Sequence, residues 1–156
     1  MNALIDYIQI EIYKTYNKKY SKKYIEDKLV PIINYICSSK SKKFLFGGSQ
    51  GIGKSSFINI ISKTIEKFYN KKILLLSLDN YYLSKKQRLI LSKQMHQLLM
   101  TRGVPGTHNV ERLVKHIKQF NKGKYPIKTP LFDKLIDDTT KSTKITKTKC
   151  DILFLE

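Results

Sequence analysis

The sequence has few cysteines and no long apolar run. Cys37 and Cys150 lie far apart and match neither a metal-ligand nor a CxxC spacing, so a reducing compartment is the simplest expectation. Asp6 and Glu11 interrupt the apolar run at the N-terminus, which argues against a signal peptide. No apolar run approaches the length of a transmembrane helix. These absences predict a cytoplasmic protein that has no membrane partner.

Acidic residues and arginine are also scarce. Asp and Glu number 12 against 30 Lys and Arg, giving a formal net charge of +18, yet only Arg88, Arg102 and Arg112 are arginines. A positive balance favours anionic partners such as nucleic acid, a membrane surface or phosphorylated metabolites. A surface selected for phosphate recognition would favour arginine, whose planar fork contacts two oxygens at once. We therefore interpret the charge as a lysine-biased solvated surface and do not expect nucleic acid as a partner.

The pattern of apolar residues predicts an α/β protein with a parallel sheet. An apolar fraction of 41 % in 156 residues suffices for the core of one domain, or of part of a larger one. Apolar residues recur at helical spacing in some segments and form short continuous runs in others. We expect N-terminal helices in 1–40 and a nucleotide-binding domain in 41–156. The expected helices span 4–17, 22–37 with a kink or break at Pro31, 54–69, 84–101 and 109–120, and the expected strands span 43–47, 72–79 and 150–155.

Two further segments bear on the organisation of the chain. Residues 139–149, TTKSTKITKTK, form a polar low-complexity stretch, which we interpret as either an exposed hairpin or a mobile loop. Glu156, the last residue, directly follows the third expected strand. No chain is left to cover or extend the sheet, so we expect the fold to be truncated at this strand.

Glycine is scarce, and its distribution is the most informative feature of the composition. Of seven glycines, four lie in GGSQGIGKSS at 47–56 and two more in TRGVPGTH at 101–108. Glycine permits positive φ and a close approach of the backbone to a ligand. These two segments are therefore the candidate sites.

The first segment carries the G-x-x-x-x-G-K-S pattern of a P-loop, between an expected strand and an expected helix. Successive backbone N–H groups would hold phosphates, Lys54 would neutralise the β- and γ-phosphates, and the Ser55 hydroxyl would bind Mg²⁺. The flanking elements disfavour the alternative, a glycine turn without a ligand. We expect ATP and Mg²⁺ as cofactors of a P-loop NTPase-type fold. The residues expected to bind the nucleotide are Gly48, Ser49, Gln50, Gly51, Ile52, Gly53, Lys54, Ser55 and Ser56.

Two carboxylates follow expected strands. Carboxylates at the C-terminal ends of parallel strands face the ligand crevice of the sheet. Asp79 ends the second strand and could accept a proton from an acceptor hydroxyl, bind Mg²⁺ through water, or cap a helix or turn. Glu156 takes the position of a Walker B acid, or is a frayed terminal residue. The catalytic candidates are thus Lys54 and Asp79, and the metal candidates are Ser55 and Glu156.

The second glycine segment and a later acidic one suggest an acceptor site. Arg102 lies beside a glycine and could bind a carboxylate, or be a surface arginine that closes a helix. His108 could donate to a substrate oxygen, although a lone loop histidine is more often structural. In PLFDKLIDD, Asp133 and Lys134 are either site residues or an exposed ion pair of little energetic weight.

The order of five segments, GGSQGIGKSS, SLDNYYLS, LLMTRGVPGTHN, PLFDKLIDD and DILFLE, resembles that of the D-glycerate 3-kinase family. This family belongs to the phosphoribulokinase, uridine kinase and pantothenate kinase group of P-loop kinases. The resemblance covers roughly residues 43–156, and RGVPGTH followed by FDK is its most specific part. It implies transfer of the γ-phosphate of ATP to the 3-hydroxyl of D-glycerate, with Asp79 as the base. The acceptor-binding residues it implies are Arg102, Gly103, Thr107, His108, Asp133 and Lys134.

Two departures from the family keep alternatives open. The family usually reads Asp-Asp-Phe-Tyr where this chain has Asp79-Asn80-Tyr81-Tyr82. Family members also continue past the Walker B acid with a Gly-Trp segment and a lid. The alternatives are a related kinase that acts on a nucleoside or pantothenate, and a catalytically incomplete P-loop fragment that binds nucleotide or nucleic acid.

Overall fold

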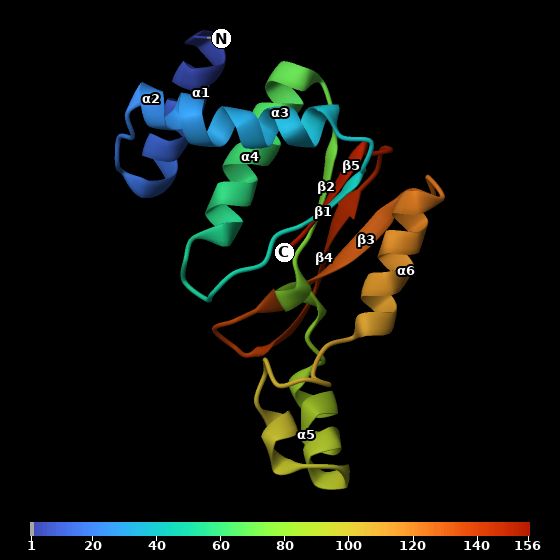
Figure 1. The fold of residues 1–156 in the computed structure, drawn as a ribbon. Coiled ribbons are helices and arrows are strands. Elements are labelled where there is room, and N and C mark those ends of the chain that lie inside the picture. The colour runs from blue at the N-terminus through green and yellow to red at the C-terminus, as the bar shows by residue number, and fades with distance from the viewer. Residues whose placement is uncertain (1) are drawn as a thin grey trace. The chain divides into compact units, whose positions relative to one another are not determined.

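The computed structural model describes residues 2–156, which form two compact units (Figure 1). Unit 1 comprises the chain up to Leu75 together with Cys150–Glu156, and unit 2 comprises Leu76–Lys149. The division into 1–40 and 41–156 inferred from the sequence stays a prediction. No helix in residues 2–156 combines the length and the apolar character that crossing a membrane requires.

Unit 1 is built around a three-stranded sheet. The strands β1 (Lys43–Leu45), β2 (Ile73–Leu76) and β5 (Ile152–Leu155) are ordered β1-β5-β2, and β1 and β5 run parallel with Phe44 opposite Phe154. The apolar run of β5 matches its central place, because Ile152, Leu153 and Phe154 are all buried. The predicted α/β fold with a parallel sheet is confirmed.

Helices supply the rest of the core of unit 1. These are α1 (Asn2–Tyr16), α2 (Lys22–Tyr24), the π-helical turn η1 (Ile25–Leu29), α3 (Val30–Ser38) and α4 (Lys54–Tyr69). Their buried faces are mostly isoleucine, for example Ile8 in α1, Ile33 in α3 and Ile61 in α4. The break expected at Pro31 takes the form of η1. Proline cannot donate a helical hydrogen bond, and a wider turn before it makes room for its ring.

One buried carboxylate joins two of these helices. Glu11 of α1 is buried, and its carboxylate accepts hydrogen bonds from Lys63 Nζ of α4 at 2.8 Å and from Lys14 Nζ at 3.0 Å. These two bonds hold the pKa of Glu11 below its ordinary value although burial opposes the shift. The residue therefore stays ionised and ties α1 to α4.

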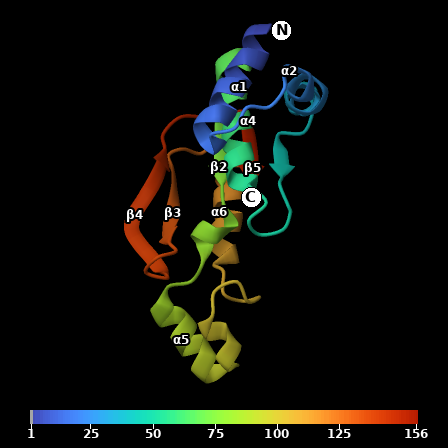
Figure 2. The same cartoon turned by 90° about the vertical axis from the view of Figure 1, so that its left-hand side faces the viewer.

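Unit 2 contains short helices and a β-hairpin. The helical elements are the 3₁₀ turns η2 (Leu78–Tyr81) and η3 (Gln97–Met100) and the helices α5 (Lys85–Gln94) and α6 (Val110–Asn121). Strands β3 (Ile127–Asp133) and β4 (Asp138–Thr146) pair antiparallel, as Figure 2 shows side by side. The stretch 139–149 thus supplies one strand of a hairpin and pairs with an earlier segment, so the hairpin interpretation holds in part.

Side-chain caps start both longer helices of unit 2. Ser84 and Gln87 form a capping box at the start of α5, with Gln87 N donating to Ser84 Oγ at 3.3 Å and Ser84 N donating to Gln87 Oε1 at 3.0 Å. Asn109 Oδ1 accepts from Arg112 N at 2.9 Å at the start of α6.

The largest differences from the predicted bounds concern two elements. The strand expected over 72–79 ends at Leu76, and its last residues form η2. The helix expected over 84–101 ends at Gln94, because His96 leaves the helical conformation and its Nδ1 accepts from Leu98 N to start η3. Histidine side-chain capping has no strong sequence signal, so the break was not predicted.

Candidate functional site

The glycine-rich loop after β1 requires glycine at two positions. Gly51 has φ +80° and Gly53 has φ +88°, in the left-handed region that L side chains rarely adopt. Gly53 is the residue before the first turn of α4, and a Cβ there would lie 3.3 Å from the Tyr16 hydroxyl. The loop therefore presents the N-terminus of α4 in a conformation that a substitution at either glycine would strain.

The side chain of Lys54 folds back onto the glycine-rich loop. Lys54 Nζ donates to Gly48 O at 2.9 Å and to Ser49 O at 2.8 Å. A positive charge is thereby held beside the first N–H groups of α4, which have no helical partners of their own. Both features attract anions, and their combination suits the phosphates of a nucleotide.

Two oxygen groups meet at the edge of this loop. Ser55 Oγ donates to Glu156 Oε1, because the parallel pairing of β1 with β5 carries the end of β5 to the start of α4. A hydroxyl and a carboxylate are ligands that Mg²⁺ accepts. Within residues 2–156 no group of three or more His, Cys, Asp or Glu could hold a metal by itself. Water and phosphate oxygens would therefore complete the coordination of an ion at Ser55 and Glu156.

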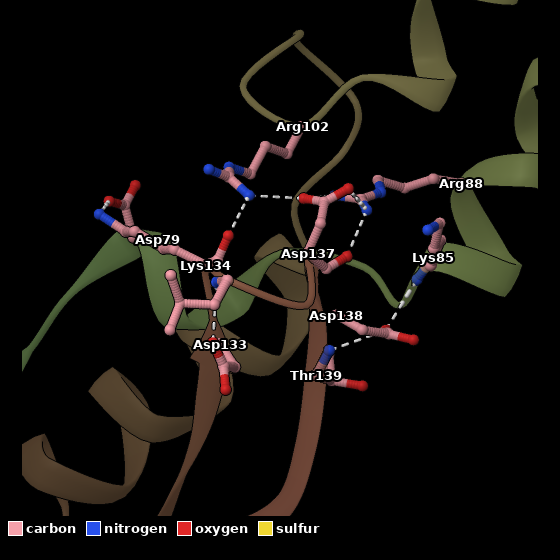
Figure 3. A network of polar contacts seen from close by, with 10 residues as sticks. Asp79, Lys85, Arg88, Arg102, Asp133, Lys134, Asp137, Asp138 and Thr139 are labelled. Carbon is pink, nitrogen blue, oxygen red and sulfur yellow. Dashed lines mark hydrogen bonds and ion pairs between the residues drawn. The ribbon is translucent and has the colours of Figure 1, made fainter.

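The acceptor candidates all lie in unit 2, and one of them, Lys134, forms an ion pair with the catalytic candidate Asp79. Lys134 Nζ contacts Asp79 Oδ2 at 2.6 Å (Figure 3). Partial burial raises the pKa of Asp79, but the hydrogen bond and the charge of Lys134 outweigh this, and the pKa lies below its ordinary value. Asp79 is thus an ionised carboxylate at neutral pH, with a side chain that is 45 % exposed.

Arg102 is held by Asp137, a residue of the turn between β3 and β4. Its Nη1 donates to Asp137 Oδ1 at 2.7 Å and to Lys134 O at 3.1 Å (Figure 3). Only Nη1 of Arg102 is used in these bonds. One nitrogen thus holds the guanidinium in place, and the Arg102 side chain is 35 % exposed.

Asp137 is itself anchored by a buried arginine. Arg88 of α5 is 0 % exposed, and its Nη2 donates to Asp137 Oδ2 and to Asp137 O, both at 2.7 Å. Asp137 has φ +56°, an uncommon conformation for a residue with a side chain. The Phe132 ring packs against both guanidinium groups, with its centroid 5.7 Å from Arg88 Cζ and 5.9 Å from Arg102 Cζ.

The neighbouring acids have other partners. Asp133 Oδ1 accepts from Leu135 N at 2.8 Å, and Lys134 pairs with Asp79, so the alternative of an ion pair between Asp133 and Lys134 is wrong. Asp133 is the last residue of β3, and Lys134 begins the turn that follows it. Asp138 Oδ1 accepts from Lys85 N at 2.8 Å and so ties the start of β4 to the start of α5.

The glycine segment 101–108 forms a tight loop beside these residues. Gly103 and Gly106 have φ +92° and +94°, and the buried Thr107 donates from Oγ1 to Val104 O at 2.6 Å. The ring of His108 stacks on Tyr82 with centroids 4.2 Å apart. Burial lowers the pKa of His108, with Asp79 opposing the shift, so the ring is neutral at neutral pH.

The sequence profile of the KAP family P-loop domain matches residues 22–150. This match covers well over half of the chain. The chain belongs to the KAP family of P-loop domains. No curated protein sequence matches it.

Solved structures similar to this KAP family chain include kinases. The structure of the YGR205w protein has a TM-score of 0.65 and 28 % identity, with 86 % of this chain and 51 % of that chain covered. D-glycerate 3-kinase from Cryptococcus neoformans has a TM-score of 0.62 and 19 % identity, with 99 % and 50 % covered. A possible uridine kinase from Bacillus stearothermophilus has a TM-score of 0.52 and 16 % identity, with 83 % and 71 % covered.

These likenesses support a P-loop kinase-like fold. The two kinases named above are less than 25 % identical to the chain, so they show the shared fold and leave the acceptor open. The chain spans about half the length of the first two structures.

The sequence-predicted residues of this KAP family domain fall into two groups. The nucleotide and metal candidates of 48–56 and Glu156 belong to unit 1, and the acceptor candidates belong to unit 2. Sequence reasoning missed Arg88 and Asp137. One signal could have found the first: in a chain whose cations are almost all lysine, an arginine is uncommon, and two of the three arginines converge on Asp137.

Replacing Asp137 by asparagine is expected to lower the free energy of unfolding of this domain by about 1–3 kcal/mol at pH 7, because the buried Arg88 loses its counter-charge. The pKa of Asp137 is lowered in the fold: burial raises it, but the bonds from Arg102 and Arg88 outweigh burial. A lowered pKa gives stability that is complete above the ordinary pKa of about 3.9 and is lost as the pH falls through the folded value. Urea denaturation should therefore show a gap between the two proteins that closes below about pH 4.

Asp133→Asn is the matched control, since it changes a carboxylate directly before the same turn and keeps an oxygen for Leu135 N. We expect it to be near neutral. A gap for Asp137→Asn that stayed constant down to pH 2 would contradict the assignment of the pairing to the ionised carboxylate.

Proposed function

We propose that the chain is the nucleotide-binding part of an ATP-dependent small-molecule kinase, which transfers the γ-phosphate to the 3-hydroxyl of D-glycerate. The observation that carries this proposal is the shared turn that links Asp79 and Arg102 through Lys134. A hydroxy acid has one group for each: a hydroxyl whose proton the Asp79 carboxylate accepts, and a carboxylate that the free edge of Arg102 binds.

The remaining groups have roles that follow from their chemistry. The loop N–H groups and Lys54 bind and neutralise the β- and γ-phosphates. Ser55 and Glu156 would hold Mg²⁺, which when bound neutralises charge on the phosphates. His108, neutral and stacked on Tyr82, offers a ring N–H to an acceptor oxygen. Asp137 keeps the Arg102 guanidinium in one orientation, so that less conformational freedom is lost when the acceptor binds.

A second candidate is hydrolysis of the nucleotide with water as the acceptor. The match to a family described as P-loop NTPases favours this candidate, because that description names no organic acceptor. In this case the cluster around Arg102 would serve the fold rather than a substrate.

A coupled assay of ADP release from Mg-ATP distinguishes the two. We would compare D-glycerate, L-glycerate, glycerol, pantothenate, uridine and no acceptor. Release that requires D-glycerate, with glycerol inactive, would support the kinase and the need for a carboxylate. Release without any acceptor would support hydrolysis, and release with uridine or pantothenate would replace the proposed acceptor. If ATP binds but no ADP is released under any condition, this chain does not carry out the transfer.

A further inference from the structure

Unit 1 contains a cavity of about 350 Å³ beside the glycine-rich loop. Its walls come from the N-terminal helices, which are blue in Figure 1, from α4, which is green, and from residues 52–54 at the end of the glycine-rich segment. The inner wall is aliphatic, with Ile8, Ile33 and Ile61. Tyr16, Tyr20 and Tyr24 form an aromatic wall. The volume lies within the range of small-molecule sites.

The three tyrosines lie at the more exposed side of the cavity. Tyr20 and Tyr24 are 39 % and 45 % exposed, and their ring centroids are 5.3 Å apart. Tyr16 is connected to the glycine-rich loop, since its hydroxyl donates to Gly53 O at 3.4 Å. Flat aromatic faces above an aliphatic floor suit a planar heteroaromatic ring, whose faces are apolar and whose edges are polar.

The charge of the cavity also limits the ligand. Lys54 is the charged residue of its lining, and no carboxylate is present there within the described residues. A ligand that carries negative charge at one end and an apolar ring at the other is therefore favoured over a cation or a purely apolar molecule.

Residues 52–54 connect the cavity to the glycine-rich loop. They line the cavity, and they are part of the loop whose N–H groups and lysine suit phosphates. In a nucleotide the base and the phosphates are joined through the ribose, so a single molecule would occupy both. We propose that the cavity receives the base of the nucleotide whose phosphates the loop binds, with Tyr20 and Tyr24 stacking on the base. This inference rests on the nucleotide binding assumed in the proposed function.

The test compares two probes that share phosphates but differ in the base. Dissociation constants for Mg-ATP and for Mg-tripolyphosphate are measured by calorimetry on the wild-type chain, Tyr20→Ala, Tyr24→Ala and Tyr13→Ala. We expect the first two variants to bind ATP about 10- to 100-fold more weakly and tripolyphosphate as the wild type does. Tyr13 is an exposed tyrosine of α1 that does not line the cavity, so its variant should match the wild type with both probes.

Each other outcome has a definite meaning. Unchanged ATP binding in both tyrosine variants, or an equal loss with both probes, would overturn the base site. If the wild-type chain binds tripolyphosphate but gains nothing from the base, the cavity proposal fails while the phosphate site stands. If it binds neither probe, the phosphate site fails as well.

A measurement on the wild-type chain avoids any folding defect of the variants. The cavity wall is rich in isoleucine, so methyl NMR of isoleucine reports directly on a ring placed inside it. ATP should shift the methyl signals of Ile8, Ile12 and Ile60 through ring currents, whereas tripolyphosphate should not. Ile145 of the hairpin serves as the control. Identical spectra with both probes would overturn the proposal.

Discussion

In the proposed kinase, replacing Asp79 by asparagine is expected to lower the rate of phosphate transfer to D-glycerate by about 10²- to 10⁴-fold while ATP binding stays within about twofold of the wild-type value. Asparagine keeps the size and one oxygen of the side chain, but it cannot accept the proton of the acceptor hydroxyl. Lys134 would lose its ionic partner, whose contact is 2.6 Å in the wild-type chain. Steady-state kinetics and ATP calorimetry on the same preparations separate the two effects.

The matched control for Asp79 is Asp27→Asn, a carboxylate of the π-helical turn in unit 1. It should leave both parameters unchanged. An Asp79 variant that keeps most of its rate would show that another group, or water, accepts the proton. An Asp79 variant that loses ATP binding would instead point to a role in holding the metal or the nucleotide.

Replacing Lys54 by alanine is expected to reduce turnover by about 10²- to 10³-fold and to weaken ATP binding as well. In the proposed function the ammonium supplies charge to the phosphates in the ground state and in the transition state, so both the turnover number and the affinity for ATP should fall. The substitution also removes the two bonds to Gly48 O and Ser49 O that hold the side chain inside the loop. The measurements are kcat with D-glycerate and the Kd of Mg-ATP.

Lys67→Ala is the control for Lys54, because Lys67 lies on the same helix and its Nζ contacts the ring of Tyr7 at 4.1 Å rather than the loop. It removes one positive charge of the same unit. If both lysine variants bound ATP equally weakly, the general positive charge of the chain rather than the loop would account for binding.

The sequence predicts features of this fold that depend on neighbouring residues. The glycine spacing of 47–53 and the caps at Ser84 and Asn109 are local signals, and the structure has the corresponding loop and helix starts. The apolar run of β5 predicts a strand buried on both faces, and β5 is the central strand. In each case the residues that cause the local structure are adjacent or nearly adjacent in the sequence.

Features that depend on distant residues could not be predicted in this way. β3 contains Pro130, which weakens the sequence signal for a strand. The strand forms because β4 pairs with it, and in a two-stranded sheet both strands are edge strands, where proline is tolerated. The contacts of Arg88 and Arg102 with Asp137 join a helix and a loop to a turn far along the chain, and no local pattern specifies them. The sequence analysis named candidate residues of the acceptor site, but it did not name Asp137, the carboxylate that pairs with both arginines.

The strand order of unit 1 has a consequence for how the protein is made. β5 separates β1 from β2 in the sheet, yet it follows every element of unit 2 in the chain. During synthesis, β1 and β2 emerge early and have no strand between them until the ribosome has translated all of unit 2. Both would then expose unpaired edges for the whole of that interval, the condition in which nascent strands are prone to wrong pairing. Codon choice and chaperone contact over residues 76–149 should therefore influence the yield of correctly folded unit 1, although none of these residues except Leu76 belongs to its sheet.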